Sequence, residues 1–202
     1  MFLGQPTSAA LPVQQDINDD DRFRCEDLQK LFDALFFERF NTRLLRGDGE
    51  PLYLPADKAV PYHRVVFAHG YFASALHEVA HWCIAGEQRR QRVDYGYWYI
   101  ADGRTAQQQV AFERVEVKPQ AIEWLFTLAC GRRFHPSADN LAAGGVDDSR
   151  FRRALQAQVV AYCEHGLPPR AQDFRTALCA CYGVSTVLRP RDVNGGNGFV
   201  DA

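Results

Sequence analysis

The sequence lacks a strong excess of charge of either sign, and it lacks any long uninterrupted run of apolar residues. Its 202 residues carry 23 Lys and Arg against 25 Asp and Glu, which gives a formal net charge of −2 at pH 7. Such a balance provides no overall positive field, so we expect no direct nucleic-acid partner. No apolar run approaches the ~20 residues that a membrane-spanning helix requires, so we expect no membrane contact either.

Paired cysteines are also missing. Six cysteines are spread along the chain, and none of them forms a Cys-x-x-Cys pair or a zinc-finger spacing. Cys83, Cys130 and Cys163 lie among apolar residues at helical spacing, as is typical of small buried side chains. We therefore expect six free thiols and a reducing compartment. Residues 1–21 have neither a basic start nor a continuous apolar segment, so no secretion signal is predicted and a cytoplasmic location is expected.

The composition supports one domain of α+β class. Hydrophobic residues make up 47% of the chain and aromatic residues 12%, which is enough material for a substantial core. Residues 1–22 and 186–202 are polar or glycine-rich and predict flexible tails at the two ends. We expect a single domain over residues 23–185, in which about five helices pack a small mixed sheet.

The spacing of apolar residues, together with cap and turn residues, predicts the individual helices and strands. Apolar spacing with cap and stop residues predicts helices over 27–40, 71–85, 119–130, 149–165 and 169–182. Thr105 is a candidate N-cap for a further helical stretch, and Pro119 is read as the first residue of a new helix. The predicted strands are a β-hairpin of 42–45 with 51–54 across Asp48-Gly49, a strand over 64–70, and an aromatic strand over 93–103.

The helix predicted over 71–85 carries two histidines four residues apart. His77 and His81 therefore project from the same helical face and can bind one ion. Glu78 completes the His-Glu-x-x-His signature of zinc proteases, in which the glutamate is the general base. The alternative is a pair of core histidines that are satisfied by hydrogen bonds. Burying Ser74, His77, Glu78 and His81 without partners would cost free energy, which favours a zincin-like metal-binding helix.

Two histidines do not complete a metal site, and the third ligand of an open site is often a carboxylate. The downstream candidates are Asp94, Glu113, Glu116 and Glu123. Glu116 comes just before the helix expected at Pro119 and can fold back onto the histidine helix, so it is our preferred ligand. Glu113 lies about one turn earlier and is the alternative. We interpret Glu123 as a solvated or capping charge.

Two long stretches carry a resemblance to a known family. Residues 40–86, which begin "FNTRLLRGDGEPLYLP" and end "HEVAHWCIAG", and residues 93–126, which end "FERVEVKPQAIEWLF", resemble the bacterial elongation factor P hydroxylases. The likeness covers about residues 26–185. It implies an enzyme that hydroxylates a lysine of elongation factor P after that lysine has received a β-lysyl group. It also implies a fold unlike that of the jelly-roll hydroxylases and similar to that of a family of metal-dependent ribonucleases.

The resemblance further implies a mononuclear Fe(II) centre of two-histidine-one-carboxylate type, one per chain. Its ligands would be His77, His81 and a downstream glutamate, for which we choose Glu116. Three facial ligands leave positions for water and then for dioxygen as co-substrate. Zinc has no redox chemistry and would not support such a reaction. The sequence contains no recognisable nucleotide motif and identifies no electron donor.

Two other functions fit the same signature. One is a zinc hydrolase of His-Glu-x-x-His type, either a peptidase or a nuclease-like relative, and the other is a non-catalytic binding module with a structural metal. Glu78 separates the first of these from a hydroxylase. In a hydrolase it would deprotonate metal-bound water, whereas in a hydroxylase it can position water or pair with a cationic substrate amine.

A dicationic β-lysyl-lysine arm favours an acidic and aromatic pocket. Alternate positions of a strand face the same side, so the predicted aromatic strand offers candidate substrate-binding residues, namely Asp94, Tyr97, Tyr99 and Asp102. Arginines that could steer an acidic translation factor towards the site follow the histidine helix and the helix predicted over 119–130. They are Arg89, Arg90, Arg92, Arg132 and Arg133, and Arg150, Arg152 and Arg153 add to them further along the chain. Such a basic patch could equally contact RNA.

Overall fold

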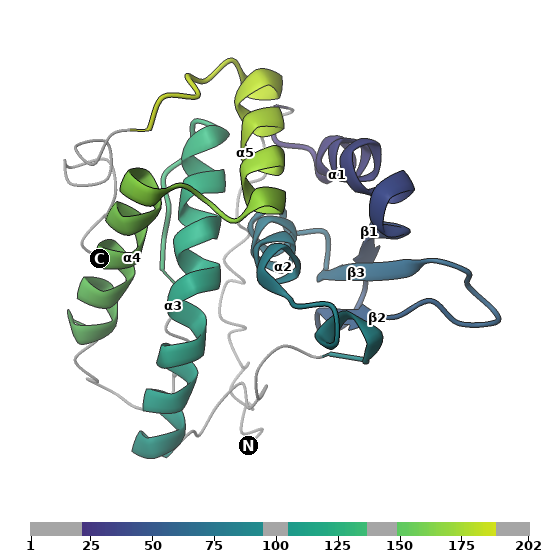
Figure 1. The fold of residues 1–202 in the computed structure, drawn as a ribbon, viewed down its shortest axis with the longest axis horizontal. Helices are drawn as coiled ribbons and strands as arrows, with labels where there is room; N and C mark the ends of the chain where they lie inside the picture. Colours follow the sequence, from purple (N-terminus) through teal and green to yellow (C-terminus); the bar gives the residue numbers. More distant parts are fainter. Residues whose placement is uncertain (1–21, 95–104, 137–148, 189–202) are drawn as a thin grey trace, which may run out of the picture.

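The computed structural model describes residues 22–94, 105–136 and 149–188 (Figure 1). Its elements are α1 (Cys25–Phe40), β1 (Thr42–Gly47), β2 (Leu52–Leu54), β3 (His63–Ala68), α2 (Phe72–Ile84), the 3₁₀ turn η1 (Arg89–Gln91), α3 (Ala106–Ala129), α4 (Ser149–His165) and α5 (Pro169–Tyr182). The prediction of an α+β domain with five helices and a small mixed sheet is confirmed for the described residues. Most of the predicted tails and of the aromatic strand lie outside those ranges.

The sheet corrects the predicted hairpin. The strand order is β1-β3-β2, so β3 lies between the two strands that the turn signal had paired. β1 runs parallel to β3 from Thr42 opposite His63 onwards, and β2 runs antiparallel to it. β3 contributes Val65 and Phe67 to the core, and both are almost fully buried. An apolar central strand stabilises both neighbours more than a hairpin of β1 with the short, half-buried β2 would, so tertiary packing overrides the local Asp-Gly signal.

The helices build two hydrophobic cores, and α2 belongs to the larger of them. In Figure 1, α2 lies between the sheet on one side and α3 on the other, and α4 covers the far side of α3. The larger core includes a cluster of aromatic rings from α1, α2 and α5, whose centroids lie 4.8 to 6.4 Å apart: Phe32, Phe36, Trp82 and Phe174. The smaller core joins α3 to α4 through Trp124, Leu125, Phe151 and Leu155. One face of α2 is thereby held against α3.

Helix α3 is longer than the sequence suggested. It runs without interruption over 24 residues, with Pro119 inside it, so the prediction of a new helix at Pro119 is wrong. The predicted N-cap is confirmed, because the Thr105 hydroxyl accepts the backbone N–H of Gln108 in a capping box. Pro119 removes one backbone donor, but it is buried, and the turns on both sides pack against neighbouring helices. Packing therefore outweighs the local cost of proline.

The structure also describes the cysteines and the length of the helices. All six cysteines are free thiols, as expected, and Cys83 and Cys130 are buried in the core. Within the described ranges, no helix is both long enough and apolar enough to cross a lipid bilayer.

The carboxyl end of α2 is held by an arginine from α5. Arg170 donates to the carbonyl of Cys83 at 2.9 Å and to that of Ala85 at 2.6 Å. Its guanidinium also lies 4.6 Å from the centroid of the Trp82 ring. A cation at this end of a helix satisfies carbonyls that have no partner within the helix and complements the negative end of its dipole. Arg170 therefore ties the histidine-bearing helix to α5.

We expect Arg170→Ala to lower the free energy of unfolding by about 2–3 kcal/mol, because two partly buried carbonyls lose a charged donor. Arg170→Lys keeps a charged donor group without the forked geometry of the guanidinium and should recover part of that loss. Urea denaturation measures both. Arg39→Ala is the control, because Arg39 forms an exposed ion pair with Asp173 and should cost less than about 1 kcal/mol. Equal losses for Arg170→Ala and Arg39→Ala would contradict the assigned role.

Candidate metal centre

Helices α2 and α3 bring the three predicted metal ligands together. His77 and His81 lie one turn apart on α2, with their Nε2 atoms 3.0 Å apart. Glu116 reaches them from α3, with Oε1 3.3 Å from His81 Nε2 and Oε2 3.6 Å from His77 Nε2. The three ligand atoms lie within 4.8 Å of one another, a spread that one coordinated ion can span. Glu113 is not in this cluster and instead accepts a hydrogen bond from Gln109 of its own helix.

The environment of Glu116 suits a metal ligand. The residue is only 3% exposed, and its Oε2 atom has no hydrogen-bond partner among the described residues. Burial alone would raise the pKa of this carboxyl, but the imidazoles of His81 and His77 lower it to about 2. The side chain is therefore a buried carboxylate with an unused oxygen. Two imidazole nitrogens and one carboxylate are a donor set that divalent transition metals accept.

Glu123 has a role that was not predicted from the sequence. It is 9% exposed rather than solvated, and its Oε2 lies 2.7 Å from His77 Nδ1, so the interpretation as a surface or capping charge is wrong. Glu116 and Glu123 are seven residues apart, which is two turns of an uninterrupted α3, and they share its face towards α2. That spacing was visible in the sequence, but the helix break assumed at Pro119 hid it.

The pair of Glu123 and His77 orients the imidazole. With Nδ1–H donated to the carboxylate, Nε2 is the nitrogen that faces His81 and Glu116. Burial disfavours the charged form of His77, but Glu123 and Glu116 outweigh it and raise the pKa to about 10. An ion would have to displace the proton on Nε2, so metal affinity should rise with pH.

We expect Glu123→Gln to weaken metal binding about 10- to 100-fold, the usual cost of losing a carboxylate that orients a histidine ligand. Glutamine can still accept the Nδ1–H bond, but it no longer supplies the negative charge. Competition with a chromophoric chelator measures the affinity. The matched control is Glu164→Gln, an exposed carboxylate at the end of α4. An unchanged affinity in Glu123→Gln would show that the carboxylate does not support the metal.

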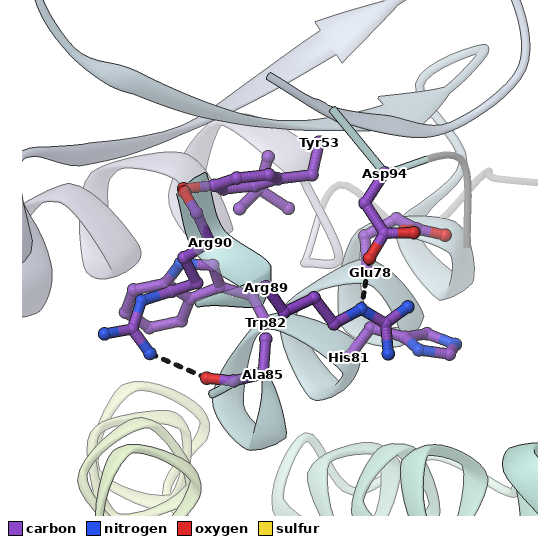
Figure 2. A pocket seen from close by; sticks show the side chains of 9 residues that line it. Tyr53, Glu78, His81, Trp82, Ala85, Arg89, Arg90 and Asp94 are labelled. Carbon is purple, nitrogen blue, oxygen red and sulfur yellow. Dashed lines mark hydrogen bonds and ion pairs between the residues drawn. The ribbon is translucent and has the colours of Figure 1, made fainter. Parts of the chain in front are cut away.

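A pocket opens beside His81 (Figure 2). Glu78, His81 and Asp94 lie towards one side of it, and Tyr53 and Trp82 lie towards the other. Burial raises the pKa of Glu78, although the imidazoles of His77 and His81 partly offset that effect. Figure 2 also shows the ion pair that Arg89 forms with Asp94. Of the four predicted substrate-binding residues, Asp94 lines this pocket, whereas Tyr97, Tyr99 and Asp102 lie outside the described residues.

Comparison with known proteins decides the family. A family model described as elongation factor P hydroxylase matches residues 31–191. The chain belongs to the elongation factor P hydroxylase family. A curated relative, the elongation factor P lysine hydroxylase of Haemophilus influenzae, is 50% identical over 159 residues, which cover 79% of this chain and 89% of that protein.

The predicted family resemblance is thus confirmed. The segment that matches the elongation factor P hydroxylase model contains α2, α3 and the pocket of Figure 2, so the whole His-His-Glu cluster belongs to the family domain. The ligand roles, the part played by Glu78 and the zincin-like character of α2 stay predictions.

Proposed function

We propose that this chain hydroxylates the β-lysylated lysine of elongation factor P at a mononuclear Fe(II) centre, one per chain, with dioxygen as co-substrate. One observation carries the proposal. Two imidazole nitrogens and a buried carboxylate with an unused oxygen converge within reach of one ion, in a chain of the elongation factor P hydroxylase family. The relative at 50% identity is an elongation factor P lysine hydroxylase, which supports the same substrate protein. A cytoplasmic site of action without direct nucleic-acid or membrane contact is part of the proposal.

The reaction replaces a C–H bond by C–OH. One atom of dioxygen enters the product and the other leaves as water, which consumes two electrons and two protons from an external two-electron reductant. Fe(II) bound by His77, His81 and Glu116 would supply the redox chemistry that dioxygen needs. Glu123 would keep the Nδ1 proton of His77 in place and so hold Nε2 towards the ion. The buried α2–α3 interface would keep these side chains in a fixed arrangement.

The pocket of Figure 2 is our proposed site for the modified lysine. It opens beside His81 and offers the carboxyl groups of Glu78 and Asp94 and the rings of Tyr53 and Trp82. An ammonium group is attracted by carboxylates and by the faces of aromatic rings. The cationic arm would take over, at Asp94, the place that the Arg89 guanidinium holds. We extend the proposed substrate contacts to Tyr97, Tyr99 and Asp102, as the sequence pattern predicts.

The direct test is the mass of elongation factor P after incubation with the iron-loaded chain, dioxygen and a reductant. The β-lysylated factor should gain the mass of one oxygen atom, and fragmentation should place it on the modified lysine. The unmodified factor is the substrate control and should react far more slowly. If both forms react equally, the β-lysyl group is not required for recognition. If neither form reacts, the proposed function is wrong.

A zinc hydrolase is the second candidate, because Glu78 lies beside His81 in the pocket, where a general base would be required. We expect Glu78→Gln to retain at least about a tenth of the hydroxylation rate, since oxygen insertion does not depend on deprotonated water. Loss of a general base in a hydrolase costs about 100- to 10,000-fold. Product formation against time measures the effect, with the exposed Glu87→Gln as the control. A loss of that size in cleavage of a peptide or an RNA, rather than in hydroxylation, would favour the hydrolase.

A further inference from the structure

A second pocket lies at the start of α2 and shares no lining residue with the first. The turn between β3 and α2 and the end of α3 form its walls. We infer that this second pocket binds a small anion through a carboxylate or phosphate group. Its lining is cationic. Three arginines, Arg46, Arg132 and Arg133, line it together with His69 and His135. The inference does not rest on the proposed function.

The arginines of the second pocket are not neutralised within the described part of the chain. Among those residues, the side chains of Arg46, Arg132 and Arg133 have neither an ion-pair partner nor a hydrogen bond. Glu123 is the acidic residue in the lining, and its Oε2 is already bonded to His77. The lining therefore has three guanidinium groups and one carboxylate, and that carboxylate is already bonded to a histidine. Such a charge balance favours an anion.

Ring contacts hold the Arg132 guanidinium in place, whereas Arg46 is exposed and lies over a glycine. Arg46 lies directly on Gly70, where an added Cβ would come 2.8 Å from its Cζ and Nε atoms, so any other residue at this turn would push the guanidinium away. Gly70 also has a φ of +78°, which favours glycine. Arg132 stacks on Phe72 and Phe23, 5.2 and 4.9 Å from the ring centroids. An anion would therefore meet one guanidinium, that of Arg132, which is already positioned, and this lowers the entropic cost of binding.

The start of α2 adds to the positive potential. This helix of 13 residues has no acidic residue in its first turn and no side-chain cap at Tyr71. Its first residues, Phe72 and Ala73, line the same pocket. The uncapped N–H groups and the positive end of the helix dipole both favour negative charge. Because these groups converge on a hollow and not on a flat face, a small anion fits better than the surface of an acidic protein.

Titration of the metal-free chain tests the inference. Inorganic phosphate and succinate are the two probes, used at constant ionic strength with sodium chloride as the reference salt, and isothermal calorimetry is the readout. We expect saturable binding with a Kd on the order of 1 mM for at least one probe. The stronger probe identifies the anionic group. Arg46→Gln and Arg132→Gln should each weaken binding about tenfold, whereas Arg114→Gln, an exposed arginine of α3 that does not line the pocket, should change nothing.

Three results would overturn the inference. They are equal heats for the probes and for chloride, equal affinity in all variants, and binding of polyglutamate by a chain that binds neither small probe. The last result would assign the arginines to an acidic protein surface instead. If Arg132→Gln lowers the melting temperature, Arg133→Gln takes its place, because Arg133 is exposed and its loss leaves the core intact.

Discussion

Glu116→Gln should abolish hydroxylation and weaken metal binding by more than about a hundredfold. Losing a residue that only orients a metal ligand costs at most about a hundredfold in metal affinity, and losing a ligand should cost more. The substitution replaces the buried carboxylate that faces both histidines with a neutral amide of the same shape. An amide binds a divalent ion poorly in such a site and no longer balances its charge. Metal content after anaerobic loading and the rate of product formation measure the two effects.

Glu113→Gln is the matched control, one helical turn away on the same helix. Its carboxylate bonds to Gln109 and lies outside the His-His-Glu cluster, so metal binding and activity should stay within about twofold of the unmodified chain. The pair of variants also decides between the two glutamates that the sequence left as candidates. The reverse outcome, with Glu113→Gln inactive and Glu116→Gln active, would move the third ligand to Glu113. Full hydroxylation by His77→Ala would show that the metal assignment is wrong.

Exchange of the metal has the other large expected effect. The chain loaded anaerobically with Fe(II) and then given β-lysylated elongation factor P, a reductant and dioxygen should form the hydroxylated product. The chain loaded with Zn(II) should form none above the metal-free background, because zinc cannot change its oxidation state. Both ions fit a site of two imidazoles and one carboxylate, so both should raise the melting temperature. Mass spectrometry of the factor and thermal unfolding separate binding from catalysis.

The zinc-loaded chain also tests the other two hypotheses. Cleavage of a peptide or an RNA by the zinc form, which the Glu78→Gln variant lacks, would establish a hydrolase in place of a hydroxylase. Stabilisation by either metal without any reaction would indicate a binding module with a structural ion. Metal analysis of protein purified without oxygen then shows which ion the chain takes up in its own cell.

The sheet illustrates which part of a fold local signals predict. The apolar runs over 42–45, 51–54 and 64–70 were recognised as strands, and strands form there. The pairing was wrong, because an Asp-Gly turn signal describes only residues near it in the chain. The order β1-β3-β2 places β3, whose Val65 and Phe67 are buried in the core, in the middle of the sheet, and that placement is a property of the assembled core.

By itself, the sequence determined the family, the α+β class and the face of α2 that carries His77 and His81, since four-residue spacing on a helix places two side chains together wherever that helix packs. Only the tertiary structure decided which carboxylates meet that face. Packing on both sides of Pro119 keeps α3 continuous, and continuity brings Glu116 to the imidazole nitrogens and Glu123 to the back of His77. Spacing is a local quantity, whereas the meeting of two helices depends on the burial of side chains far apart in the chain.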